Sequence, residues 1–244
     1  MSAPVELSLV IPVYNERESL PVLVEEIGRA LAGRGGGERY EIVAVDDGST
    51  DGSLDVLKAL KREHPEIHIV AFAANAGQTA AFAAGFGAAR GRVIVTLDAD
   101  LQNDPADIPV LLAELDRSGA AAVVGYRVDR RDSGWKRLQS RIANGVRNRL
   151  NRETIRDTGC SLKALRAEAL RALPLFTGMH RFLPTLVRMQ GGLVTEVPVR
   201  HRARRFGKTK YGMWNRAFRA LVDALAVRWM QRRALRYRVR EELP

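Results

Sequence analysis

The sequence predicts an α/β fold with a mostly parallel sheet, because apolar strand patterns alternate with amphipathic helix patterns. The strand patterns lie at residues 7–13, 40–46, 67–72 and 92–98. The helix patterns lie at residues 20–32, 51–62 and 78–90, and a glycine cluster separates the first of them from the second strand. Strands joined by helices of this length favour right-handed crossovers and parallel neighbours.

Polar side chains follow three of these strands, at the point where each strand ends. Asn15 follows the first, Asp46 and Asp47 close the second, and Asp98 and Asp100 close the fourth. In an open parallel sheet, ligands bind beyond the carboxyl ends of the strands. We therefore expect these three clusters to meet in one site.

The pattern becomes less regular after residue 104. We expect a helix at 109–117, a strand at 121–126, a basic helix at 135–150, a late strand at 194–200 and a basic, glycine-containing loop at 204–212. The chain thus divides into a domain at 1–212 and a tail at 213–244. Single-domain size fits the chain length of 244 residues.

The net charge of +11 comes from the tail. Residues 200–244 hold 14 Lys or Arg and three Asp or Glu, whereas residues 1–199 hold 25 of each sign. This distribution argues against a general nucleic-acid binder. The single cysteine, Cys160, excludes a disulfide framework and suits a reducing cytoplasm.

The ends of the chain predict peripheral membrane attachment. The N-terminus lacks the basic region of a signal peptide, and Arg219, Asp223 and Arg228 interrupt the best candidate for a membrane-spanning helix. Apolar residues instead recur at helical spacing among arginines: Trp214, Phe218, Leu221, Val222, Leu225 and Trp229. Such a helix suits an anionic membrane surface, or its apolar stripe packs on the domain's own core or on an oligomer partner.

Asp98 and Asp100 are hard oxygen ligands suited to Mg²⁺ or Mn²⁺, and Gln102 can supply a further oxygen. The alternative is that these acids only cap a turn. After the second strand, Asp47 or its neighbour Asp46 can bind a nucleoside, while Gly48 permits a tight turn. The same segment can also cap the helix that follows.

Three motifs, in this order and spacing, resemble glycosyltransferase family 2: IPVYNE at 11–16, VDDGSTD at 45–51 and LDADLQ at 97–102. Further segments resemble the polyprenyl-phosphate sugar synthases of the dolichyl-phosphate mannose synthase type: GYR at 125–127, DTGCSLK at 157–163, HRF at 180–182 and RRFGKTKYG at 204–212. The resemblance covers about nine-tenths of the chain. It implies a GT-A fold with a Rossmann-like sheet, and inverting transfer of a hexose from a GDP- or UDP-sugar to a lipid phosphate.

The resemblance also implies roles for individual residues. Residues 1–104 would form the nucleotide-sugar half and 105–212 the acceptor half. The nucleotide-sugar contacts would be Pro12, Tyr14, Glu16, Asp46, Asp47, Gln78, Asp98, Ala99 and Asp100. A divalent metal, Mg²⁺ or Mn²⁺, would be held by Asp98, Asp100 and Gln102, with Asp100 as the direct ligand.

Arginines match the family positions that approach the phosphates, for which a guanidinium fork is suited. Arg127 and Arg141 match the contacts to the acceptor phosphate, and Arg204, Arg205 and Lys210 match a loop that closes over donor and acceptor. Arg141 can equally be a surface charge of its basic helix.

Asp157 is a candidate acceptor-side base or structural acid, and alternatively an N-cap of the segment before Cys160. His180 is a candidate acceptor contact or a packed, hydrogen-bonded residue.

The acceptor is predicted from a missing motif. Family members that act on a sugar hydroxyl often use the Asp of a Glu-Asp pair as general base, and no such pair occurs between residues 104 and 240. A phosphomonoester, with a second pKa of about 6, is already a nucleophile near pH 7. We therefore expect a polyprenyl phosphate acceptor at the cytoplasmic face of the membrane.

Two other functions stay open, a family 2 enzyme acting on a glycan or other hydroxyl and a basic binding module without catalysis. A separate small membrane protein and a homo-oligomer are possible partners, and no nucleic acid is expected.

Overall fold

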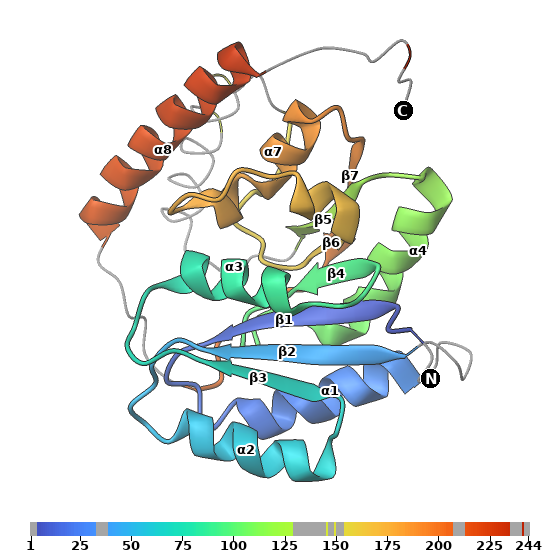
Figure 1. Cartoon of the computed structure of the whole chain (residues 1–244), viewed down its shortest axis with the longest axis vertical. Coiled ribbons are helices and arrows are strands. Elements are labelled where there is room, and N and C mark those ends of the chain that lie inside the picture. Colours follow the sequence, from blue (N-terminus) through green and yellow to red (C-terminus); the bar gives the residue numbers. More distant parts are fainter. Residues whose placement is uncertain are drawn as a thin grey trace.

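The computed structural model describes residues 4–32, 39–128, 145, 149, 154–206, 213–234 and 241. In this part of the chain, seven strands form one sheet in the order β3-β2-β1-β4-β6-β5-β7, with helices on both faces (Figure 1). The predicted α/β class is confirmed.

The N-terminal half of the sheet forms where the strand patterns predict it. Its four strands are β1 (Leu7–Val13), β2 (Tyr40–Asp46), β3 (Ile67–Ala71) and β4 (Val93–Thr96). β1 pairs in parallel with β2 and β4, and β2 pairs in parallel with β3. The register sets Val13 opposite Asp46, so the polar segments after β1 and β2 leave the sheet side by side.

The second half adds one strand that the sequence patterns do not predict. The strands here are β5 (Ala122–Arg127), β6 (Lys163–Arg166) and β7 (Val194–Val199). β6 lies between β4 and β5 and is antiparallel to both, whereas β7 is parallel to β5. β6 has only four residues and carries a charge at each end, so neither an apolar run nor an alternating pattern marks it.

Alternate residues of the strands supply two cores. On one face, Leu9 and Ile11 pack in a cluster with residues of α1 (Leu20–Ala32), α2 (Ser53–Glu63) and α4 (Ile108–Ser118). On the other face, Val10 packs under α3 (Gln78–Ala88). A Cβ on Gly85 of α3 would lie 2.3 Å from a methyl of Val10, so the small residues of this helix permit its close approach to the sheet.

The remaining helices cover the same face as α3. They are α6 (Ala167–Arg171), α7 (Leu183–Met189) and α8 (Met213–Arg233), together with a short 3-10 turn at Met179–Arg181. A second 3-10 turn, at Pro105–Asp107, contacts α1 on the opposite face. α8 is the predicted C-terminal helix, and its Ala224 and Val227 are buried in the α3-side core. The predicted helix at 135–150 lies outside the described residues, apart from Gly145 and Arg149, which are helical. None of the described helices combines the length and apolar character needed to cross a bilayer.

Candidate active site

A cleft of about 400 Å³ opens at the carboxyl ends of β1, β2 and β4. The three sequence-distant polar clusters contribute to its lining, as the parallel topology requires. The lining residues are Pro12, Val13, Tyr14, Glu16, Asp47, Gln78, Asp98, Ala99, Asp100, Gln102, Arg127, Gly159 and Arg204. Most of the residues predicted to contact the nucleotide-sugar and metal therefore share one cavity.

The segment after β1 is tied to the segment after β2. Asn15 has a positive φ of 53°, which turns the chain sharply after the strand. Its backbone N–H donates to Ser49 Oγ at 3.0 Å, and its side-chain oxygen accepts from Thr50 N at 2.8 Å. These contacts fix the backbone that places Tyr14 and Glu16 at the cleft.

Asp47 organises the wall formed by residues 75–77. Its carboxylate accepts from Ala76 N at 2.7 Å, from Gly77 N at 3.0 Å and from the Asn75 side chain at 2.9 Å. Gly48 has φ 68°, and a Cβ there would lie 2.6 Å from the backbone of residues 74 and 75. The two loops can approach this closely only because residue 48 is glycine.

The acidic pair Asp98 and Asp100 follows the end of β4 on a tight turn. Asp100 Oδ1 accepts from Gln102 N at 3.1 Å, and the intervening residue Leu101 has a positive φ of 61°. Gln78 Nε2 donates to Asp98 Oδ1 at 2.8 Å. Burial, followed by repulsion from Asp100, raises the pKa of Asp98 from 3.8 to about 6.

This donor set fits a hard divalent cation. Two carboxylates and the Gln102 amide line the same cavity, and a cation there would relieve the repulsion that raises the pKa of Asp98. Within the described residues, no group of three or more His, Cys, Asp or Glu side chains is arranged to hold a metal. That suits an ion that takes its remaining ligands from substrate phosphate and water, as Mg²⁺ commonly does.

Arg204 reaches the acidic pair from the segment after β7. Its Nη2 lies 2.6 Å from Asp100 Oδ2, and its Nη1 lies 3.4 Å from Glu16 Oε1. Arg204 therefore joins the β1, β4 and β7 ends of the sheet at the cleft.

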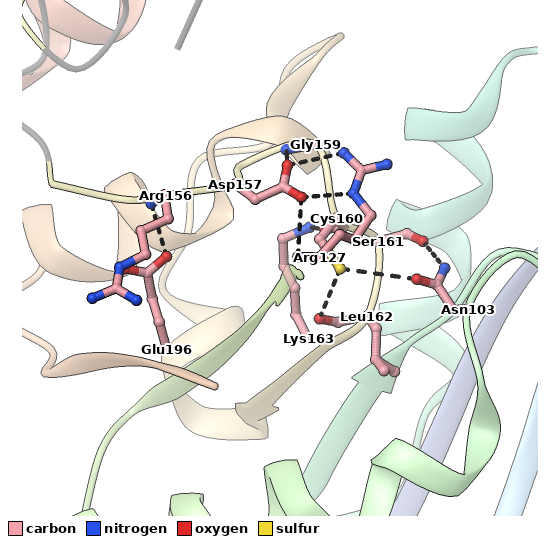
Figure 2. Close-up of polar contacts among 10 residues, drawn as sticks. All are labelled: Asn103, Arg127, Arg156, Asp157, Gly159, Cys160, Ser161, Leu162, Lys163 and Glu196. Carbon is pink, nitrogen blue, oxygen red and sulfur yellow. Dashed lines mark hydrogen bonds and ion pairs between the residues drawn. The ribbon is translucent and has the colours of Figure 1, made fainter. Parts of the chain in front are cut away.

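Arg127, at the end of β5, also lines this cavity and brings positive charge to it. It forms a two-point ion pair with Asp157, with Nε 2.6 Å from Oδ2 and Nη2 2.9 Å from Oδ1 (Figure 2). The Gly159 N–H also donates to Asp157 Oδ1, at 3.2 Å. Both carboxylate oxygens of Asp157 are thus engaged, which favours its interpretation as a structural acid.

Lys163 is a buried cation that the sequence patterns did not identify as a site residue. It is 3% exposed, and its ammonium group donates to the carbonyl of Cys160 in the loop that follows Asp157 (Figure 2). Burial lowers its pKa, while Asp98 and Asp157 act in the opposite direction. The DTGCSLK motif at 157–163 contains Lys163 and could have drawn attention to it. Its burial, however, depends on strand β6, which the sequence patterns do not predict.

Several predicted site residues do not line the cleft. Asp46 is buried beneath it, where its carboxylate accepts from Ser49 N at 3.2 Å, and Arg205 is exposed with its guanidinium 6.0 Å from the centre of the Phe206 ring. His180 lies under α3, with Nδ1 2.9 Å from Thr79 Oγ1 and its ring stacked on Phe82. This favours the packed, hydrogen-bonded interpretation of His180. Arg141 and Lys210 lie outside the described residues.

Comparison with known proteins agrees with this geometry. Residues 8–173 match the family model described as Glycosyl transferase family 2. The chain is 41% identical over 231 residues to dodecaprenyl-phosphate galacturonate synthase of Rhizobium johnstonii, covering 93% of this chain and 68% of the relative. It is 39% identical over 208 residues to undecaprenyl-phosphate 4-deoxy-4-formamido-L-arabinose transferase of Edwardsiella ictaluri, covering 85% of this chain and 63% of the relative.

Solved structures show the same fold at low sequence identity. Glucosyl-3-phosphoglycerate synthase of Mycobacterium tuberculosis, in complex with Mn²⁺ and UDP-glucose, superposes with a TM-score of 0.69 at 20% identity, covering 91% of this chain and 78% of that one. A mannosyltransferase of Pyrobaculum calidifontis, in complex with GDP-Man and Mn²⁺, gives 0.66 at 20% identity, covering 92% and 65%. The predicted GT-A fold is confirmed.

Proposed function

Because the chain belongs to glycosyltransferase family 2, we propose that it moves a sugar from a nucleoside-diphosphate sugar to a polyprenyl phosphate, with inversion. One observation carries the proposal: the acidic pair Asp98 and Asp100 shares a single cleft with Arg127 and Arg204. A donor diphosphate needs a cation between it and the carboxylates, and a guanidinium is well suited to an acceptor phosphate.

On the donor side, Asp98, Asp100 and Gln102 would hold Mg²⁺ or Mn²⁺. When bound, the cation neutralises negative charge on the departing diphosphate. Tyr14, Glu16 and Asp47 border the same cavity and would surround the nucleoside, with Asp47 acting partly through the 75–77 wall that it holds. Arg204 would add a second positive charge near the diphosphate.

On the acceptor side, Arg127 would orient the lipid phosphate. Asp157 fixes its guanidinium at two points, so little conformational entropy is lost when a phosphate binds. An acceptor phosphate oxygen attacks the anomeric carbon, and the bond from that carbon to the diphosphate oxygen breaks on the opposite side. A phosphate dianion carries no proton on the attacking oxygen, so this step needs no general base.

The outer face of α8 supports a peripheral position at the membrane. Leu221, Val222, Leu225 and Trp229 are 43–62% exposed, while Ala224 and Val227 of the same helix are buried. Arg228, Arg232 and Arg233 accompany them in sequence. We assign this exposed face to the cytoplasmic side of an anionic membrane, where a lipid phosphate acceptor is available.

The test is a transfer assay with purified protein, polyprenyl phosphate and Mg²⁺ or Mn²⁺. Radiolabelled donors would include GDP-mannose, UDP-glucose and UDP-GlcNAc, together with activated galacturonate and activated 4-deoxy-4-formamido-L-arabinose, the sugars named for the two relatives. We expect a labelled lipid with at least one donor, and none when EDTA is present. Product that forms only on a soluble hydroxyl acceptor would contradict the lipid phosphate assignment.

Membership of glycosyltransferase family 2 shows a glycosyltransferase, so the basic binding module without catalysis is set aside. The remaining alternative is a family 2 enzyme that acts on a glycan or other hydroxyl, and the acceptor arm of the transfer assay distinguishes it.

A further inference from the structure

Three arginines at alternate positions after β7 pair with acids that lie between residues 16 and 107. Arg200 pairs with Asp107, with Nη2 2.8 Å from Oδ1, and Arg202 pairs with both Glu26 and Asp104 at 2.7 Å. Arg204 pairs with Asp100 and Glu16. Because side chains of an extended segment alternate, residues 200, 202 and 204 face the same side.

The backbone reinforces this attachment directly beside the acidic pair. Arg202 N donates to the carbonyl of Gln102 at 2.8 Å, and Asn103 forms a β-bridge with His201. The first two arginines therefore anchor the segment at the loop that follows Asp100. Arg204 is the member of the series whose partners line the cleft.

Arg204 neutralises two poorly hydrated carboxylates. Asp100 is 7% exposed and Glu16 is 9% exposed. Asp100 Oδ1 accepts from Gln102 N, and Asp100 Oδ2 lies 2.6 Å from Arg204 Nη2. A cation coordinated by Asp100 would meet the guanidinium at this second oxygen, and the two positive charges would repel each other at close range.

We propose that Arg204 and the divalent cation compete for Asp100, and that binding of the cation releases Arg204 to the donor diphosphate. The proposal rests on the metal-dependent transfer proposed above. Arg200 and Arg202 keep their own acids throughout, so only the Arg204 side chain has to exchange partners. The exchange therefore couples cation binding to diphosphate binding. The cation frees the Arg204 guanidinium, which then pairs with the diphosphate that accompanies the cation.

The test measures Mn²⁺ binding to the nucleotide-free protein, by the electron paramagnetic resonance signal of free Mn²⁺. Arg204→Gln removes the competitor, so we expect Mn²⁺ alone to bind about tenfold more tightly than to the parent chain. Arg205→Gln is the matched control, because it removes the same charge one residue away, and Arg205 makes no contact with Asp100 within the described part of the chain. It should change the Mn²⁺ affinity by no more than about twofold.

A second measurement, of nucleotide binding, should show the opposite effect of the same substitution. With saturating Mn²⁺, Arg204→Gln should bind GDP or UDP about tenfold more weakly, because the diphosphate loses a charge-assisted partner. Thermal unfolding of the variant with and without Mn²⁺ checks folding, and Mn²⁺ should raise the melting temperature of Arg204→Gln more than that of the parent chain.

Unchanged or weaker Mn²⁺ binding by Arg204→Gln, relative to Arg205→Gln, would overturn the competition. This failure is distinguishable from failure of the proposed function, which shows as absence of lipid product from the parent chain in the transfer assay.

Discussion

Arg127 and Asp157 meet in a two-point ion pair that joins the end of β5 to the loop before β6. The Arg127 side chain is 17% exposed and that of Asp157 is 7% exposed, so water screens the pair weakly. The pair therefore has a structural and an orienting consequence, and both can be measured.

Asp157→Asn leaves the Arg127 charge without its carboxylate. We expect the free energy of unfolding to fall by about 2 to 3 kcal/mol. This is at or below the low end of the range for breaking a fully buried pair, because Arg127 is partly exposed. We also expect the KM for polyprenyl phosphate to rise more than kcat falls, because Arg127 loses its orientation. Urea unfolding and initial-rate kinetics measure the two effects. Asp55→Asn, whose side chain is 86% exposed, is the control and should change neither quantity.

Asp100→Ala removes the carboxylate that we assign as the direct metal ligand. Turnover should fall at least about 100-fold, because charge on the departing diphosphate is no longer neutralised. Circular dichroism should show an intact fold. Asp55→Ala serves as control for the loss of one acidic charge. A fully active Asp100→Ala protein would refute the metal site.

Asp98 should make stability depend on pH in a defined direction. Its pKa is about 6 in the folded chain against an ordinary value of 3.8, so the folded state binds the extra proton between these values. The contribution of this proton to stability is present below about pH 4 and is lost as the pH rises through about 6.

Above about pH 6 the ionised Asp98 carboxylate destabilises the folded state, because it is buried beside Asp100, and Asp98→Asn removes this cost. In EDTA, its gain in unfolding free energy should grow between about pH 4 and about pH 6 and reach on the order of 2–3 kcal/mol above that range. The variant should also lose transfer activity. Thermal and urea unfolding across this pH range provide the measurement, and a gain that does not change with pH would contradict the assigned cause.

The exposed face of α8 can be tested without removing the helix. Deletion of the helix would expose the core around Ala224 and Val227, so point substitutions are the sharper probe. Leu225→Glu combined with Trp229→Glu should weaken binding to anionic vesicles at least about tenfold, with little change in melting temperature. Vesicle co-sedimentation measures the binding.

Val110→Glu is the matched control, since Val110 is 48% exposed on α4. It should leave vesicle binding unchanged. Equal vesicle binding by the double variant and the parent chain would contradict the assignment of α8 to the membrane surface.

Local sequence signals predicted the first half of the molecule well. Strand β1 and helix α1 have the predicted bounds, because apolar periodicity and turn residues act over about ten residues of chain. β4 ends at Thr96 instead of Asp98, because the acidic pair already lies on the turn that presents it to the cleft. In the second half, β6 carries no comparable local signal and depends on the open edges of β4 and β5.

The sequence by itself determined the α/β class, the parallel pairing of the first strands and the meeting of Asp47, Asp98 and Asp100 at one edge of the sheet. The tertiary structure alone decided which charges are paired. Arg204 and Glu16 are 188 residues apart, and Arg127 and Asp157 are 30 apart. Strand ends converge because topology follows from local patterns, whereas ion pairs require the packing of distant segments to within hydrogen-bond distance.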